Sequence, residues 1–236
     1  MNIQSLTLCK LAMAGAMYDS LTPFNKSLGR LNEDTGNNLD LLNGEHRLSL
    51  LKWLNAWGCR NLSKGQHEVA SDSILSWYQE EGPGLFSDDE PIWYLGDSEL
   101  KTAALAYGSL KDKPGAWRLR GGTNNEVHFG PTAASKVLFA IRPQALMPWD
   151  EAMRAGFGCD GTPKSYFRFL IKIRSITLHI ADLCKNKGFQ IEELPGKLGR
   201  PDSTVLALVN EYIWVTETRE VVLPSSEIMA QWAELG

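Results

Sequence analysis

The chain has 236 residues, of which 43% are hydrophobic and 22% charged, and its formal net charge is −4. This composition is ordinary for a globular protein, and the length suits one domain with a large core. No run approaches the roughly 18 apolar residues that cross a membrane, and residues 1–5 lack the basic start of a signal peptide. We therefore expect a cytoplasmic protein with no membrane partner.

The four cysteines, Cys9, Cys59, Cys159 and Cys184, are scattered, and no pair has the C-x-x-C spacing. This argues against a structural zinc ion or an iron–sulfur cluster and fits a reducing compartment. The chain also lacks an H-E-x-x-H motif and a glycine-rich nucleotide-binding loop. We expect neither a metal nor a cofactor.

Apolar residues recur at three- and four-residue spacing through most of the chain, which predicts helices. The predicted helices cover residues 8–18, 46–57, 69–78, 98–107, 163–187, 203–216 and 226–235. Ser98 is the expected cap of the fourth, Asp202 or Ser203 that of the sixth, and Leu170 and Leu178 should face inward from the fifth. Residues 32–38 and 61–67 read as polar loops, and 111–122 as an irregular basic segment. The sequence predicts a mainly α fold with few or no strands.

The most informative stretch covers residues 129–154. Gly130 begins a turn into a helix whose residues Ala133, Ala134, Val137, Leu138 and Ile141 have the spacing of a buried face. Pro143 ends that helix, because proline lacks a backbone donor and disfavours a helical conformation before it. Pro148-Trp149-Asp150 then opens a second helix. Asp150 lies where unpaired backbone amides favour a carboxylate.

This order of a glycine turn, an apolar helix, a proline-containing loop and a Pro-x-Asp step resembles the helix-hairpin-helix DNA glycosylase superfamily, which includes 8-oxoguanine glycosylase and endonuclease III. The match covers about thirty residues. The resemblance implies a single domain, 1–236, in which helical subdomains of about residues 45–149 and 1–44 plus 150–236 flank a cleft. Here the hairpin has one glycine where the family usually has two, and Trp149 replaces a small aliphatic residue.

Charge is distributed unevenly along the chain. From Trp117 to Arg200 there are 13 Lys and Arg against 7 Asp and Glu, while the remainder has 11 against 21. A basic segment within an acidic protein suits a face that contacts phosphates. The alternative is uneven but solvated surface charge.

Five residues are candidates for contact with DNA: Arg118, Arg120, His128, Gly130 and Thr132. The two arginines alternate with aromatic Trp117, a pattern that suits stacking on bases and contact with phosphate. Gly130, Thr132 and His128 lie at the predicted hairpin. The alternatives are a core position for Trp117, solvated arginines and a loop histidine with internal partners.

The resemblance makes Asp150 the catalytic residue, because a fixed carboxylate stabilises the positive sugar that forms as the glycosidic bond breaks. Its alternative role is that of a helix cap alone. Glycosylases that also cut the strand need a lysine nucleophile, and Pro131 occupies the position where such members carry it. Lys136, further along the helix, is a second catalytic candidate, although it could instead hold a phosphate or an acidic neighbour.

Trp149 is a candidate wall of the pocket that would receive a flipped-out base, or else a core residue. Residues 61–67 could supply the side chain that fills the gap in the duplex. We therefore expect a monomeric DNA glycosylase that acts on double-stranded DNA and uses water rather than an amine. Its substrate could be a damaged base, or a hypermodified phage base such as glucosylated hydroxymethylcytosine. The alternatives are a non-catalytic helix-hairpin-helix DNA-binding protein and a helical protein unrelated to nucleic acid.

Overall fold

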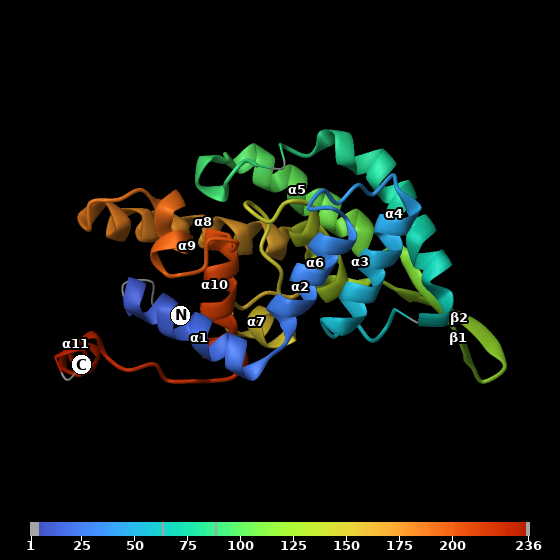
Figure 1. Cartoon of the computed structure of the whole chain (residues 1–236). Helices are drawn as coiled ribbons and strands as arrows, with labels where there is room; N and C mark the ends of the chain where they lie inside the picture. Colours follow the sequence, from blue (N-terminus) through green and yellow to red (C-terminus); the bar gives the residue numbers. More distant parts are fainter. Residues whose placement is uncertain (1–4, 63, 88, 235–236) are drawn as a thin grey trace.

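The computed structural model describes residues 5–62, 64–87 and 89–234 (Figure 1). These residues form a mainly helical protein with one two-stranded sheet, which confirms the prediction of a mainly α fold with few strands. The helices are α1 (Leu8–Leu21), α2 (Phe24–Asp34), α3 (Gly44–Ala56), α4 (His67–Glu81), α5 (Asp97–Lys111), α6 (Gly130–Ile141), α7 (Glu151–Gly156), α8 (Pro163–Asn186), α9 (Leu194–Lys197), α10 (Val205–Ile213) and α11 (Ser226–Ala233). Short 3-10 turns cover Lys64–Gln66, Gly82–Gly84, Ile92–Tyr94 and Ile191–Glu193, and a π-helical turn, Trp214–Thr218, continues α10.

Most of the predicted helices are present, with corrections at two starts. The cap of α5 is Gly96 rather than Ser98, and the Glu99 carboxylate accepts a hydrogen bond from the Gly96 amide at 2.6 Å. The cap of α10 is Thr204, whose hydroxyl accepts from the Ala207 amide. In each case a neighbouring residue satisfies the unpaired amides of the first turn.

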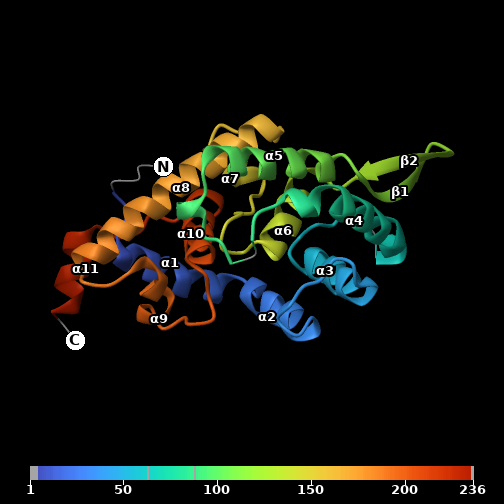
Figure 2. The ribbon, with the colours of Figure 1, turned by 90° about the horizontal axis from the view of Figure 1, so that it is seen from above.

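The prediction missed α2 and read residues 32–38 as a loop. Residues 32–34 belong to α2, and its N-terminal half lies in a segment for which no helix was predicted. Among its described residues only Leu31 is buried. The polar composition hid the helix, because α2 lies on the surface of α3 and α6 rather than within the core (Figures 1 and 2).

The sequence suggested that the segment 111–122 is irregular. In the structure, most of it forms the first strand of a β-hairpin. Strand β1 (Pro114–Arg120) pairs antiparallel with β2 (Thr123–His128), and the turn consists of Gly121 and Gly122, both with positive φ. Glycine adopts such angles without steric cost, so the Gly-Gly pair was the feature of the sequence that could have predicted a hairpin turn here. The hairpin projects from the helical body in both views (Figures 1 and 2).

Helix α6 lies inside the molecule, where α5 and α3 pack against it (Figure 2). All five of its predicted core residues are buried. Helix α8 packs against α5, and its buried face contains Ile176, Thr177 and Ile180. Leu170 is buried as predicted, but Leu178 is 46% exposed, so the predicted inward face of α8 was partly wrong.

The ends of the described chain come together on one side, where α1 packs on α10 and on the π-helical turn (Figure 1). Tyr18 of α1 meets the ring of Trp214 edge-on at 5.1 Å between centroids. No helix in the described part of the chain combines the length and apolar character needed to cross a bilayer.

Candidate functional site

The segment between α6 and α7 is fixed against α6 by Ser135, which is fully buried. Its hydroxyl accepts a hydrogen bond from the Trp149 amide at 3.2 Å and donates to the Thr132 carbonyl at 3.0 Å. At the other end of the segment, the Arg142 guanidinium donates to the Phe86 carbonyl at 2.7 Å. The step into α7 therefore has a defined position relative to the first turn of α6.

Asp150 is the N-cap of α7, as the sequence predicted. Its Oδ1 accepts from the Met153 amide at 2.8 Å, and the Thr218 hydroxyl donates to Oδ2 at 3.0 Å. Thr218 comes from the π-helical turn, 68 residues further along the chain. Among the described residues Asp150 forms no ion pair, so its negative charge is held by neutral donors and by the positive end of α7.

A cavity of about 240 Å³ opens beside this carboxylate. Its walls are mainly aromatic and come from distant parts of the chain. The lining residues are Tyr18, Phe24, Trp57, Gly58, Thr132, Lys136, Pro148, Trp149, Asp150, Met153, Asn210 and Trp214. A mostly apolar cavity with a few polar groups, here including the ionisable Asp150 and Lys136, is the usual form of a small-molecule site.

Lys136 lines the same cavity, and its side chain is buried. Its Nζ donates a hydrogen bond to the Trp57 carbonyl and lies 4.7 Å from the centroid of the Trp57 ring. Burial lowers the pKa of the amine, and the nearby Cys59 thiol and Asp150 carboxylate act in the opposite direction. This buried ammonium group is not placed to hold a phosphate on the surface.

Trp149 also borders the cavity, but its ring lies in an aromatic cluster within the core. It meets Tyr107, Tyr166 and Phe169 with centroid distances of 5.7, 4.8 and 5.1 Å. Its Nε1 donates to the Pro131 carbonyl at 3.1 Å. Trp149 therefore borders the cavity from within the core, and the other aromatic side chains that line it are Trp57, Trp214, Tyr18 and Phe24.

The predicted hairpin residues lie at the start of α6. Gly130 has φ of +71°, which turns the chain from β2 into the helix. Thr132 borders the cavity, and its hydroxyl accepts from the Arg154 guanidinium at 3.0 Å. The first turn of α6 therefore lies next to the Asp150 carboxylate.

The remaining predicted DNA contacts lie outside the cavity, on the β-hairpin. Arg118 and Trp117 are exposed, the latter by 41%, so Trp117 is not a core residue. The backbone of Arg120 pairs with Thr123 next to the turn. His128 is half-exposed, with Nε2 3.8 Å from the Glu126 carboxylate.

The loop 61–67 was expected to supply a side chain that fills the gap in the duplex, but its polar groups hold the hairpin instead. Asn61 Nδ2 donates to the carbonyls of His128 and Phe129, both at 2.9 Å. Gln66 bonds both the amide and the carbonyl of Trp117. Ser63 of this loop lies outside the described residues.

Sequence reasoning missed the Thr218 hydroxyl and most of the aromatic wall. Trp57 belonged to a predicted apolar stripe, which gave no reason to place it at a site. Tyr18, Phe24 and Trp214 carry no motif, since their role depends on contacts between the two ends of the chain.

Comparison of the chain with protein-family models, with curated proteins and with solved structures finds no match.

Proposed function

We propose that the protein is a DNA glycosylase that hydrolyses the N-glycosidic bond of a base flipped out of double-stranded DNA and leaves an abasic site. The observation that carries the proposal is the position of Asp150. Its carboxylate is at a helix start, is held by neutral donors, and borders a cavity with aromatic walls.

In this reaction the bond between C1′ and the base nitrogen breaks, and its electron pair leaves with the base. The sugar becomes positively charged, and the Asp150 carboxylate stabilises that charge at close range. The oxygen of a water molecule then bonds to C1′, and Asp150 accepts a proton from it. The rings of Trp57 and Trp214 suit a planar base, which stacks on aromatic side chains after it leaves the duplex.

Two features support the binding of DNA. The first turn of α6 adjoins the site and presents backbone amides next to Gly130, an arrangement that suits a phosphate group. The β-hairpin carries Arg118 beyond the helical body. Both belong to the segment of residues 117–200 with an excess of positive charge. We propose that the monomer binds duplex DNA through this side in the cytoplasm.

Hydrolysis by water is favoured over attack by an amine. The resemblance places Pro131, not a lysine, at the position of the amine nucleophile, and the Lys136 Nζ is engaged by the Trp57 carbonyl. Its proposed role is electrostatic, within the wall of the cavity. Treatment of the reaction with borohydride should leave no covalent enzyme–DNA adduct, whereas trapping at Lys136 would show a glycosylase that also cuts the strand.

The alternative is a helix-hairpin-helix protein that binds DNA without catalysis. The test incubates the protein with damaged, natural and phage genomic DNAs, and measures released bases by mass spectrometry and abasic sites on the DNA. Asp150→Asn should abolish base release and keep salt-dependent DNA binding, because asparagine still caps α7. Asp160→Asn is the matched control, since Asp160 accepts from Thr162 away from the cavity. DNA binding with no base released from any DNA would favour the non-catalytic alternative.

A further inference from the structure

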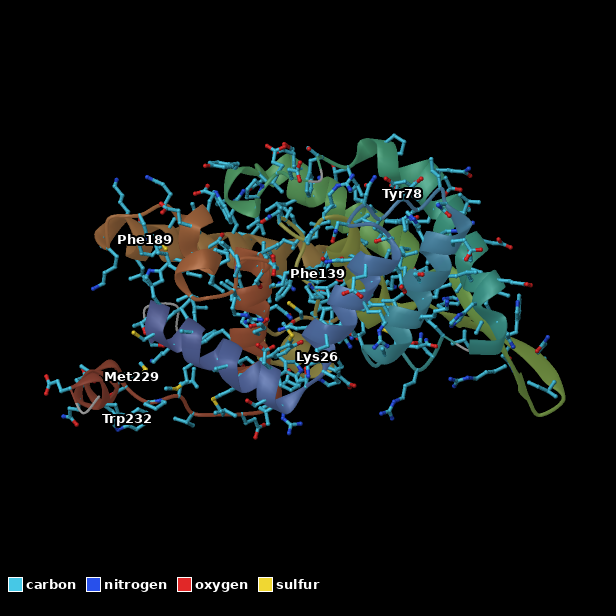
Figure 3. The ribbon with its side chains drawn as sticks, in the orientation of Figure 1. Lys26, Tyr78, Phe139, Phe189, Met229 and Trp232 are labelled. Atoms are coloured by element: carbon cyan, nitrogen blue, oxygen red, sulfur yellow. The ribbon has the colours of Figure 1, made fainter. Side chains whose placement is uncertain are left out.

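A second cavity, of about 380 Å³, lies under α2 on the side away from Asp150. Its apolar lining includes Leu28, Phe139 and Pro143. Its polar lining comes from α2 and from the loop before α10: Asn25, Asn32, Arg200, Asp202, Ser203 and Thr204. Figure 3 shows Phe139 near the middle of the molecule, behind α2.

A narrow space of about 10 Å³ lies between the two cavities. It shares Tyr18, Phe24, Trp57 and Asn210 with the cavity beside Asp150. It shares Asn25, Leu28, Phe139 and Ala207 with the second cavity. The narrow space is therefore bordered by side chains of both cavities, and it has room for about one water molecule. We call the row of three spaces the path and the narrow space its constriction.

One face of α2 covers the whole path. Phe24, Asn25, Leu28, Gly29 and Asn32 border successive parts of it, at the spacing of neighbours on one side of a helix. The side chains that narrow the path, Phe24 and Leu28, are only half-buried. Both pack against the core, Phe24 edge-on to the rings of Trp57 and Trp214, so a ligand that passes through the constriction must displace these two side chains.

The second cavity offers unused hydrogen-bonding groups. Among the described residues the side chains of Asn32, Asp202 and Ser203 form no hydrogen bond or ion pair with the protein. They line the same cavity as the apolar side chains of Phe139 and Pro143. A cavity with both polar and apolar lining suits a ligand with hydroxyl groups on a compact ring or chain.

We infer that the second cavity receives a substituent of the excised base, and that the substrate class is a base with a bulky, hydroxyl-rich group attached. This inference rests on the proposed glycosylase function. The base itself occupies the cavity beside Asp150. Its substituent extends under α2, through the constriction, and bonds to the polar side of the second cavity.

The test uses two substitutions with opposite effects on the path. A Cβ atom at Gly29 would meet nothing within 4 Å, so Gly29→Phe adds a ring at the border of the second cavity without a backbone clash. Leu28→Ala removes atoms from the constriction. Asp34→Phe, on the opposite side of α2 and outside the path, is the control for an added aromatic ring.

The substrates are DNA that contains hydroxymethylcytosine and the same DNA after enzymatic glucosylation of the hydroxymethyl groups. The measurement is the ratio of base release from glucosylated to plain DNA. We expect Gly29→Phe to lower this ratio by about tenfold or more, since steric exclusion in a pocket has effects of that order. Leu28→Ala should raise the ratio, and Asp34→Phe should leave it unchanged. Thermal unfolding of each variant checks that it is folded.

If the wild-type protein releases plain or damaged bases but never the glucosylated base, the inference is overturned and the proposed function stands. An unchanged ratio in both Gly29→Phe and Leu28→Ala overturns it as well. If no base leaves any DNA while DNA binding persists, the proposed function fails and this inference fails with it. A reduced ratio in Gly29→Phe with a raised ratio in Leu28→Ala supports it.

Discussion

The Asp150 carboxylate depends on two donors from different parts of the chain, and the Thr218 hydroxyl is the one that can be removed by mutation. Thr218→Val should lower kcat for base release by about tenfold to a hundredfold with little change in KM, because the carboxylate loses its orientation rather than its charge. Thr216→Val is the control, since its hydroxyl bonds to the carbonyls of Tyr212 and Ile213 in the same turn. Equal losses in both variants would contradict a positioning role for Thr218.

The buried amine of Lys136 makes stability depend on pH. Burial lowers its pKa from the usual 10.5 in the folded protein. Between that lowered pKa and 10.5, the unfolded chain binds more protons than the folded one, so the free energy of unfolding rises with pH. The stability of the wild-type protein relative to Lys136→Met should therefore increase as the pH rises toward 10.5. Urea unfolding at several pH values measures this difference, and a difference that is constant or falls with pH would contradict it.

At the scale of an element, the start of α6 depends on the positive φ of Gly130. A Cβ atom there would meet nothing within 4 Å, so a substitution tests the backbone conformation alone. Gly130→Ala should destabilise the protein by about 1 kcal/mol, the cost of a left-handed conformation for alanine. Gly29→Ala, inside α2, should instead stabilise it by about 0.5–1 kcal/mol. Chemical denaturation of the two variants measures the change in the free energy of unfolding that each causes. Equal changes would show that the turn at Gly130 carries no strain.

The β-hairpin is the element that extends furthest from the body, and Arg118 is exposed on it. If this arginine neutralises one phosphate, Arg118→Ala should weaken binding to all DNA sequences alike. It should also reduce the slope of log affinity against log salt concentration by about 1. Lys101→Ala, on the exposed side of α5, serves as the control. An unchanged salt slope in Arg118→Ala would show that Arg118 does not contact a DNA phosphate.

The elements that the sequence predicted well are those with a buried apolar face of their own. The five core positions of α6, the proline that ends it and the cap at Asp150 follow from local spacing and local backbone chemistry. The surface helix α2 has little buried area, and the hairpin pairs two polar segments outside the core, so neither has a strong periodic signal. Thr218 and the ring of Trp214 reach the site only through tertiary contacts, which no local pattern contains.

At the scale of the whole molecule, a buried charged group connects the two ends of the described chain. Glu211 of α10 is 1% exposed and accepts hydrogen bonds from Arg200 and from Asn25 of α2. Arg200 also lies 3.7 Å from the Asp19 carboxylate of α1. Glu211→Ala leaves Arg200 without its buried partner and should lower the free energy of unfolding by about 3 kcal/mol. Thermal or urea unfolding measures this loss. A loss in the free energy of unfolding well below that value would show that water replaces the Glu211 carboxylate as the partner of Arg200.

The contact between Tyr18 and Trp214 also sets the time at which the site is formed during synthesis. A ribosome releases α1, α2 and Asp150 well before the π-helical turn that ends at Thr218. A nascent or prematurely terminated chain therefore has the acidic residue but lacks both its hydroxyl partner and one aromatic wall. Under the proposed function, we expect such unfinished chains to release bases far more slowly than the finished protein, because their site is incomplete.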